Sequence, residues 1–319
     1  MEIKQDSKEA EEFRSNAGIK FNTIRYEKDK EQPQIVYITL NRPEKINAID
    51  IGQGKMTQEI KDAVERVNED DDVKVVIFKG EGGNFSAGYD LEQVYRVYGG
   101  SPTFRPYQRR RLMIDDTQII GFVKAVLNCL KVTMAQIQGW CIEAGIWLAE
   151  ACDISIAASD AKFAHRGNRL AFGGFPIMPL ELLSGHTKKI TELLITGRTI
   201  SGAEAEEIGI ITKAVPPEDL EPEVYNLAKA ICVLPRDAIT IGKISRRHTL
   251  NQIGALLTDS AVVYHTLGTN IRYVKEDEEA LMFIKGREEK TAKNSFHKFH
   301  SLFEEALEKT KYFKSFRPG

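Results

Sequence analysis

One almost wholly apolar stretch, residues 73–78, limits the folds that are open to this chain. It reads VKVVIF and is followed by a glycine-rich turn that begins at Gly80. Such a run is typical of a strand covered on both faces, as in a parallel sheet packed by helices. A β-branched and aromatic run at residues 35–40 precedes it, with a helical pattern over residues 51–68 between the two. The sequence therefore predicts an α/β fold.

The strand–turn–helix pattern recurs along the chain. Strand character returns at residues 132–137 and 154–158, helical character at 142–150 and 188–195, and residues 208–215 run from a turn into another strand. No GxGxxG or GxxxxGK sequence accompanies these units, so nothing supports a phosphate-binding loop of either type. We predict a core built by stacking similar units.

The chain changes character at about residue 235. Beyond this point the sequence has helical periodicity and no strand candidates, in residues 235–257, 258–270, 276–286 and 294–311. We therefore divide the chain into a flexible leader (1–20), an α/β core (21–234) and a C-terminal helical oligomerisation region with an extended tail (235–319). The aromatic stripe of the last helix is typical of a packing face, and it could also be a subunit interface.

Composition excludes several classes of function. The 319 residues carry a formal net charge of -2, which gives no global reason to expect nucleic acid as a partner. The longest apolar stretch, residues 140–158, contains Glu143, Glu150 and Asp153, which makes it a poor membrane span. The four cysteines form no CxxC pair and no metal-ligand pattern. We expect a cytoplasmic protein with buried thiols, no metal site and no membrane partner.

Two glycine-flanked turns carry the chemical information. They are residues 83–91 (GNFSAGYDL) and residues 138–145 (QGWCIEAG), the second leading from a strand into a helix. Small residues let a ligand carbonyl approach the backbone, and a helix start offers N–H groups without intrahelical acceptors. Two such N–H groups that converge on one oxygen form an oxyanion hole, which stabilises an enolate or a tetrahedral intermediate.

The ordered motifs of this chain resemble those of the crotonase (enoyl-CoA hydratase/isomerase) superfamily. The resemblance covers about residues 20–285, and its landmarks are residues 41–48 (NRPEKINA), 85–91, 138–140, 152–154, 196–205 and 209–215. It implies a spiral of repeated ββα units with a C-terminal helical trimerisation region. It also implies an acyl-CoA thioester substrate, with coenzyme A as part of the substrate and no separate cofactor, and a homotrimer or a dimer of trimers.

The resemblance assigns roles to individual positions. It implies that the backbone N–H groups of Ala87 and Ala144 form the oxyanion hole. It places coenzyme A contacts at the residues of two segments, namely Lys45, Ile46, Ser86 and Tyr89. Trp147 is implied to shape the acyl pocket, with Arg166 beside it to bind a substrate carboxylate, unless Arg166 forms only a surface ion pair.

The sequence also departs from the hydratase pattern of this family. Trp147 and Gly167 stand where those hydratases usually have their two glutamates, and residues 171–176 lack the aspartate of the ring-opening branches. Two residues remain as catalytic candidates. His165 is either a general base or a hydrogen-bonded histidine at a strand end. Glu143 stands where the family usually has glycine, and is either a displaced acid/base or a carboxylate at a helix N-terminus.

Residues 93–116 correspond to a variable family segment that often covers the acyl group. Its aromatic residues suit a lid, whereas the charge run at residues 109–111 (RRR) more often forms a solvated face. Tyr264 and His265 are candidates to reach a neighbouring subunit's pocket.

We expect an acyl-CoA-processing enzyme of the enoyl-CoA hydratase/isomerase type, a lyase with an atypical acid/base set. Two alternatives stay open. One is hydrolysis of a C–C bond in a cyclic 3-oxoacyl-CoA, and the other is a non-catalytic acyl-CoA-binding homologue.

Overall fold

The computed structural model describes residues 20–97, 107–170, 178–254, 262–263, 266–267 and 292–317. Nearly all of the predicted leader and the expected helix at residues 276–286 lie outside these ranges, as do Tyr264 and His265. Most of the expected helix at residues 258–270 also lies outside them.

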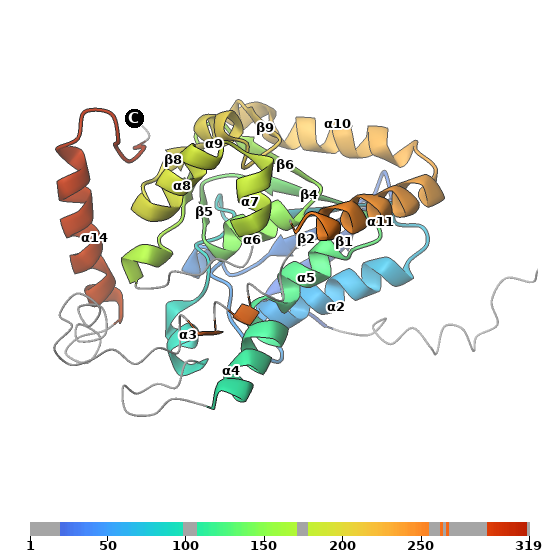
Figure 1. Ribbon diagram of the computed structural model, residues 1–319. Helices are drawn as coiled ribbons and strands as arrows, with labels where there is room; N and C mark the ends of the chain where they lie inside the picture. Colours follow the sequence, from blue (N-terminus) through green and yellow to red (C-terminus); the bar gives the residue numbers. More distant parts are fainter. Residues whose placement is uncertain are drawn as a thin grey trace, which may run out of the picture.

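A six-stranded sheet forms the centre of the fold (Figure 1). Its strands follow the order β1 (Ile24–Lys28), β2 (Ile35–Leu40), β3 (Val75–Gly80), β4 (Val132–Ile137), β6 (Ile154–Ala158) and β9 (Lys213–Val215). The β1–β2 pair is antiparallel and every other pair is parallel. All residues of β3 except Lys79 are buried, which confirms that this strand is covered on both faces.

A second sheet of three short strands lies beside the first. It consists of β5 (Trp140–Ile142), β7 (Lys162–Ala164) and β8 (Ile200–Ser201), with β5 and β7 parallel. β4 and β6 each belong to the large sheet and lead within a few residues into β5 and β7 of the small one. The chain thus repeats a β–β–α unit, and its α/β class with a parallel sheet is as predicted.

Helices cover the large sheet. α10 (Leu220–Cys232) contacts β2, β3, β4 and β6, α2 (Met56–Glu69) packs on β1 and β2, and α6 (Ala144–Ala151) packs on β4 and β6. Other helices with described bounds are α3 (Leu91–Val97), α4 (Gln108–Ile114), α5 (Gly121–Leu127), α7 (Met178–Ser184), α8 (Thr187–Thr196), α9 (Gly202–Ile208), α11 (Arg236–Gln252) and α14 (Ala292–Glu308). Short turns of helix are η1 (Pro43–Lys45), η2 (Asp115–Ile119), η3 (Gly167–Leu170) and η4 (Pro217–Asp219).

Two helix boundaries differ from the sequence prediction for local reasons. α2 begins at Met56 rather than at residue 51, because the Asp50 carboxylate accepts the Met56 N–H at 2.8 Å and the intervening Gly52 and Gly54 have positive φ. The expected helix at residues 142–150 is divided into β5 and α6, because Glu143 between them adopts φ 46° and ψ -112°.

The C-terminal helix α14 lies at the edge of the molecule and contacts η3 (Figure 1). Glu304 of α14 forms an ion pair with Arg169 of η3 at 2.7 Å, and Leu307 is buried. Beyond the helix, the Phe316 N–H donates to the Thr199 carbonyl at 2.7 Å. These contacts anchor the tail to the segments around β7 and β8, whereas a role of residues 235–319 in trimerisation stays a prediction.

Within the described residues, no helix has both the length and the apolar character needed to cross a bilayer.

Candidate active site

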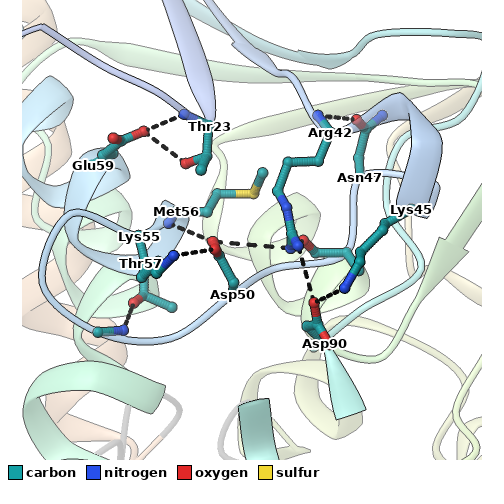
Figure 2. Close-up of polar contacts among 12 residues, drawn as sticks. Thr23, Arg42, Lys45, Asn47, Asp50, Lys55, Met56, Thr57, Glu59 and Asp90 are labelled. Carbon is teal, nitrogen blue, oxygen red and sulfur yellow. Dashed lines mark hydrogen bonds and ion pairs between the residues drawn. The ribbon is translucent and has the colours of Figure 1, made fainter. Parts of the chain in front are cut away.

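The first predicted turn is held by a polar network (Figure 2). The Asn47 amide group donates to the carbonyls of Glu81 and Asn84, each at 2.8 Å, while its side-chain oxygen accepts the Arg42 N–H at 2.9 Å. The Ser86 hydroxyl donates to the Asn47 carbonyl at 2.8 Å. Two landmarks far apart in sequence, residues 41–48 and 85–91, therefore form one structural unit.

Asp90, near the end of this turn, forms ion pairs with two basic side chains. Its Oδ2 lies 3.0 Å from Arg42 Nη2 and 3.1 Å from Lys45 Nζ (Figure 2). Burial by itself raises the pKa of Asp90, but hydrogen bonds from Arg42 and Lys45 and their charges hold it below its ordinary value. The Lys45 side chain is still 43% exposed, and Ile46 beside it is exposed as well. Lys45 and Ile46, two of the four predicted coenzyme A contacts, thus lie at the surface, whereas Ser86 is fully buried.

The same region ties the edge strand to α2. The buried Glu59 carboxylate accepts the N–H of Thr23 at 2.7 Å and its hydroxyl at 2.6 Å (Figure 2). This contact holds the start of β1 against α2, the helix that comes after residues 41–48.

The structure brings the two predicted turns side by side. Phe85 and Ser86 donate their N–H groups to the carbonyls of Gln138 and Trp140, each at 2.8 Å, and the Ile142 N–H donates to the Ser86 carbonyl at 2.9 Å. Gly88 faces the second turn so closely that a Cβ atom there would lie 2.7 Å from the Ile142 carbonyl oxygen. Only glycine fits at this position, because its φ is also +81°.

The N–H groups of Ala87 and Ala144 only partly match the predicted oxyanion hole. Ala144 is the first residue of α6, where N–H groups lack an acceptor within the helix. The Ala87 N–H, in contrast, donates to the Ile46 carbonyl at 2.9 Å. This hydrogen bond corrects the expectation that Ala87 offers its N–H to a substrate, because the turn itself uses that donor.

The N–H groups of Gly88 and Tyr89, also in the first turn, point in different directions from each other. The Gly88 N–H donates to the Ser86 hydroxyl at 3.1 Å. Tyr89 forms a parallel bridge with Ile49, in which Ile49 bonds to Gly88 and Asp90 on either side of Tyr89. In such a bridge the N–H of the middle residue points away from the partner strand. The Tyr89 N–H therefore faces away from Ile49.

Glu143 stands at the junction of β5 and α6 in a backbone conformation that side chains rarely adopt. Its φ of 46° with ψ of -112° is a region populated mainly by glycine. Strain of this kind costs on the order of 1–3 kcal/mol and is typical of functional sites. Its carboxylate lies 3.7 Å from Nδ1 of His165, and its side chain is 17% exposed. The structure therefore brings the two predicted catalytic residues together.

His165 follows β7 and is completely buried, so it does not reach solvent. Its Nε2 lies 2.6 Å from Oε1 of Glu181 on α7, a residue with no exposed surface. Burial lowers the pKa of His165, but the charge of Glu181 and hydrogen bonds to Glu143 and Glu181 outweigh burial and raise it to about 10. The charges around the ring therefore favour its imidazolium form.

Sequence reasoning missed two acidic residues of this cluster. Glu181 lies on α7, and Glu150 lies on α6 near it. Burial raises the pKa of Glu150 well above its ordinary value, and the neighbouring Glu181 carboxylate raises it further. A signal was present in the sequence, since each is a lone carboxylate in an otherwise apolar helix, IWLAEA and PLELL.

Aromatic side chains pack against one another beside the two turns. Trp147 is almost fully buried, and its ring packs edge-on against Tyr89 with centroids 5.6 Å apart. Tyr89 contacts Phe122 in the same manner, and its hydroxyl donates to the Ile119 carbonyl. Trp147 Nε1 is buried without an acceptor among the described residues. Tyr89 and Trp147, predicted from different turns, thus form one aromatic wall.

Replacing Trp147 by Ala is expected to lower the free energy of unfolding by about 3–5 kcal/mol, since a large buried ring leaves a cavity. Trp147→Phe is the matched control. It keeps most of the ring volume and removes a buried N–H without an acceptor, so its cost should stay below about 1.5 kcal/mol. Urea unfolding of both variants measures the difference, and equal losses would contradict the packing role.

Arg166 contacts residues other than Trp147. Its Nη2 donates to the Thr199 hydroxyl at 3.3 Å, and its guanidinium lies over the Trp140 ring at 5.3 Å from the centroid. Burial lowers the pKa of Arg166 to about 10, and the nearby charge of Arg169 adds to this effect. A direct role in an acyl pocket with Trp147 stays a prediction.

The predicted lid is only partly described. Arg109 and Arg110 are exposed, as a solvated face requires, but Arg111 is fully buried and lies 3.2 Å from Asp115. This ion pair corrects the expectation for the third arginine of the run. The aromatic residues Tyr98 and Phe104 lie outside the described residues.

Within the described ranges no group of three His, Cys, Asp or Glu residues could hold a metal ion, and all four cysteines are buried and unpaired.

The fold is a parallel α/β sheet in which a glycine-containing turn lies against the segment that leads into α6. The sequence model of the Enoyl-CoA hydratase/isomerase family matches residues 30–284. The chain therefore belongs to the enoyl-CoA hydratase/isomerase family, within the crotonase superfamily.

Individual relatives agree with this. The chain is 32% identical over 262 residues to the putative enoyl-CoA hydratase EchA13 of Mycobacterium tuberculosis, covering 76% of this chain and 78% of that protein. It is 30% identical over 220 residues to the mitochondrial enoyl-CoA hydratase domain-containing protein 3 of Rattus norvegicus, covering 67% of each. A probable enoyl-CoA hydratase of Mycobacterium smegmatis superimposes with a TM-score of 0.67 at 28% identity, over 77% of this chain and 93% of that one.

Proposed function

We propose that this protein is an acyl-CoA isomerase of the enoyl-CoA hydratase/isomerase type, in which Glu143 carries the proton. The observation that supports this is a single partly exposed carboxylate, directly before the N-terminus of α6 and backed by a buried histidine. His165 is too buried to touch a substrate, so it acts through Glu143 rather than as the base itself.

The proposed oxyanion hole uses the N–H groups of Ala144 and Tyr89. Ala144 offers a donor at a helix N-terminus. We assign the second donor to Tyr89, because its N–H points away from Ile49 and its neighbour Gly88 lies close to Ile142 and Glu143. A thioester oxygen held between these two donors becomes more negative as the enolate forms, which is where such donors stabilise most.

Shifting a double bond fits one carboxylate better than hydration does. Glu143 removes a proton from the carbon next to the thioester, the electron pair moves into the enolate, and the same group returns the proton to the far end of the extended enolate. Hydration needs two groups acting together, one to activate water and one to protonate carbon. The resemblance implies two glutamates for that task, and Trp147 and Gly167 occupy their positions.

The test is an incubation of the purified protein with 2-enoyl-, 3-enoyl- and cyclic 3-oxoacyl-CoA esters, with products read by mass and ultraviolet absorbance. Isomerisation leaves the mass unchanged and creates or removes conjugation with the thioester. A gain of one water to a hydroxyacyl-CoA would make the protein a hydratase, and a dicarboxylic monothioester would make it a C–C hydrolase. Tight binding of esters without turnover would make it a non-catalytic acyl-CoA-binding protein.

We further propose that Lys45 binds a phosphate of coenzyme A. Lys45→Ala is expected to raise KM for the CoA ester about 5- to 10-fold with little change in kcat, since a half-exposed charge contributes about 1 kcal/mol. Lys55→Ala is the matched control. Lys55 has the same 43% side-chain exposure and also pairs with a buried aspartate, Asp50. An equal rise in KM for both variants, or none for Lys45→Ala, would contradict the assignment.

A further inference from the structure

Glu181 is a buried carboxylate that the proposed mechanism does not use. It lies on α7, its side chain has no exposed surface, and its Oε1 is 2.6 Å from Nε2 of His165. A buried carboxylate is costly unless it is paired with a charge or fully hydrogen-bonded. Its partner is the ring that also faces Glu143.

The His165 ring lies between two carboxylates. Nδ1 is 3.7 Å from Oε2 of Glu143, and Nε2 is on the side of Glu181. A neutral imidazole has one N–H and can donate toward only one of them, whereas an imidazolium donates toward both. The two ion-pair distances place the ring between the carboxylates, with the fully buried Glu181 as its closer counter-ion.

We propose that Glu181 is the positioning residue of this site: its buried carboxylate holds the His165 ring as an imidazolium and aims Nδ1–H at Glu143. This inference rests on the proposed function, in which Glu143 is the group that exchanges a proton with the substrate. Glu181 touches neither the substrate nor Glu143, and it acts only through the histidine.

The charges around the cluster favour this assignment. Glu143 precedes α6, Glu181 lies on α7, and Glu150 of α6 neighbours Glu181. Burial and then the Glu181 charge raise the pKa of Glu150 well above its ordinary value, which favours its neutral form. Arg166, the residue that follows His165 in the chain, adds a positive charge near Glu143. In this arrangement the His165 imidazolium is the counter-ion of both Glu143 and Glu181. Glu150, beside Glu181, is the fourth member of the cluster.

The chemical consequence concerns Glu143. To accept a proton from carbon, Glu143 must be ionised before the substrate is deprotonated. An N–H donor that carries a positive charge favours the ionised carboxylate and fixes its direction. If Glu181 loses its charge, the ring loses its closer counter-ion and becomes neutral at working pH. Glu143 then loses the charge beside it.

The direct test measures the ionisation of His165 by NMR in protein labelled with ¹³C-histidine, with His165→Asn used to identify its signal. In the native protein this histidine should titrate near pH 10. Glu181→Gln should lower its pKa by two units or more. Glu150→Gln is the matched control and should leave the His165 titration in place, because burial already favours the uncharged form of the group that it replaces.

Activity gives the second readout. Glu181→Gln should reduce kcat about 10- to 100-fold with KM nearly unchanged, and should move the acidic limb of the kcat–pH profile to higher pH. A purely structural glutamate would lower the yield of folded protein without moving that limb. An unchanged His165 titration in Glu181→Gln would overturn the proposal. If that variant does not fold, an ordinary His165 pKa near 6.5 in the native protein would overturn it as well.

These outcomes separate the two proposals. Absence of turnover across the CoA-ester panel contradicts the proposed function, while the NMR titration still decides whether Glu181 sets the state of His165. Full activity of Glu181→Gln alongside an inactive Glu143→Gln would reject Glu181 and leave the proposed function intact.

Discussion

Glu143→Gln is expected to lower kcat by about 100-fold or more, with KM changing little. Glutamine keeps the size of the side chain and an acceptor oxygen, but it cannot take a proton from carbon. The measurement is steady-state turnover of the CoA ester that the panel identifies as the substrate. Turnover at the native level in Glu143→Gln would remove Glu143 from the mechanism.

Glu143→Gly is a companion variant that separates chemistry from folding. Because residue 143 has φ 46°, glycine relieves backbone strain that glutamine retains. We expect Glu143→Gly to lose at least as much turnover as Glu143→Gln while its free energy of unfolding rises by about 1 kcal/mol. A more stable but inactive protein is the result that a strained catalytic residue predicts. A marked loss of stability would instead indicate that the Glu143 side chain holds the fold together.

The second large effect is on the pH dependence of stability. The pKa of His165 is raised in the folded protein to about 10, from an ordinary value of 6.5. The folded state therefore binds this proton more tightly than the unfolded state does. The stabilisation is fully present below about pH 6.5 and is lost as pH rises toward 10, at up to about 1.4 kcal/mol per pH unit.

The measurement is the free energy of unfolding by urea at a series of pH values, for the native protein and for His165→Asn. The difference between the two curves isolates His165. This matters because Glu150, whose pKa is also raised, contributes a loss of the same sign that begins at lower pH. The buried thiols Cys141 and Cys152 contribute only at the alkaline end. A difference curve that is flat between pH 6.5 and 10 would contradict the imidazolium assignment.

Much of the fold could be predicted because it depends on local patterns. The apolar run at residues 73–78 indicated a strand buried on both faces, and β3 is such a strand. The small residues of the first turn were expected to let a ligand carbonyl approach the backbone, but at Gly88 the close neighbour is the Ile142 carbonyl of the second turn. Glu143 and His165 were both candidates before their contact was known, since the first interrupts a glycine pattern and the second follows a strand beside it.

The partners of individual N–H groups and charged side chains could not be predicted from local patterns. The N–H of Ala87 bonds to Ile46 because residues 41–48 fold across the turn, and that approach is a long-range contact. Arg111 looked like one of three surface charges, but α4 buries it against Asp115. Arg166 follows His165 directly, yet it contacts Thr199 and Trp140, whereas His165 points to Glu181. Neighbours along an extended chain face opposite sides.

By itself, the sequence determined the parallel α/β architecture, the two turns and the family, because hydrophobic periodicity and glycine positions act through the nearest neighbours in the chain. Only the tertiary structure decided the charge state of the site. His165 follows β7, Glu181 lies on α7, and Glu143 and Glu150 belong to the start and body of α6, so the ionisation of His165 and Glu150 depends on distances of a few ångströms between separate parts of the buried interior. Electrostatic energy changes steeply over such distances when solvent does not screen it. For that reason, a histidine that the sequence marks as a possible base becomes, in the fold, the buried cation between two carboxylates.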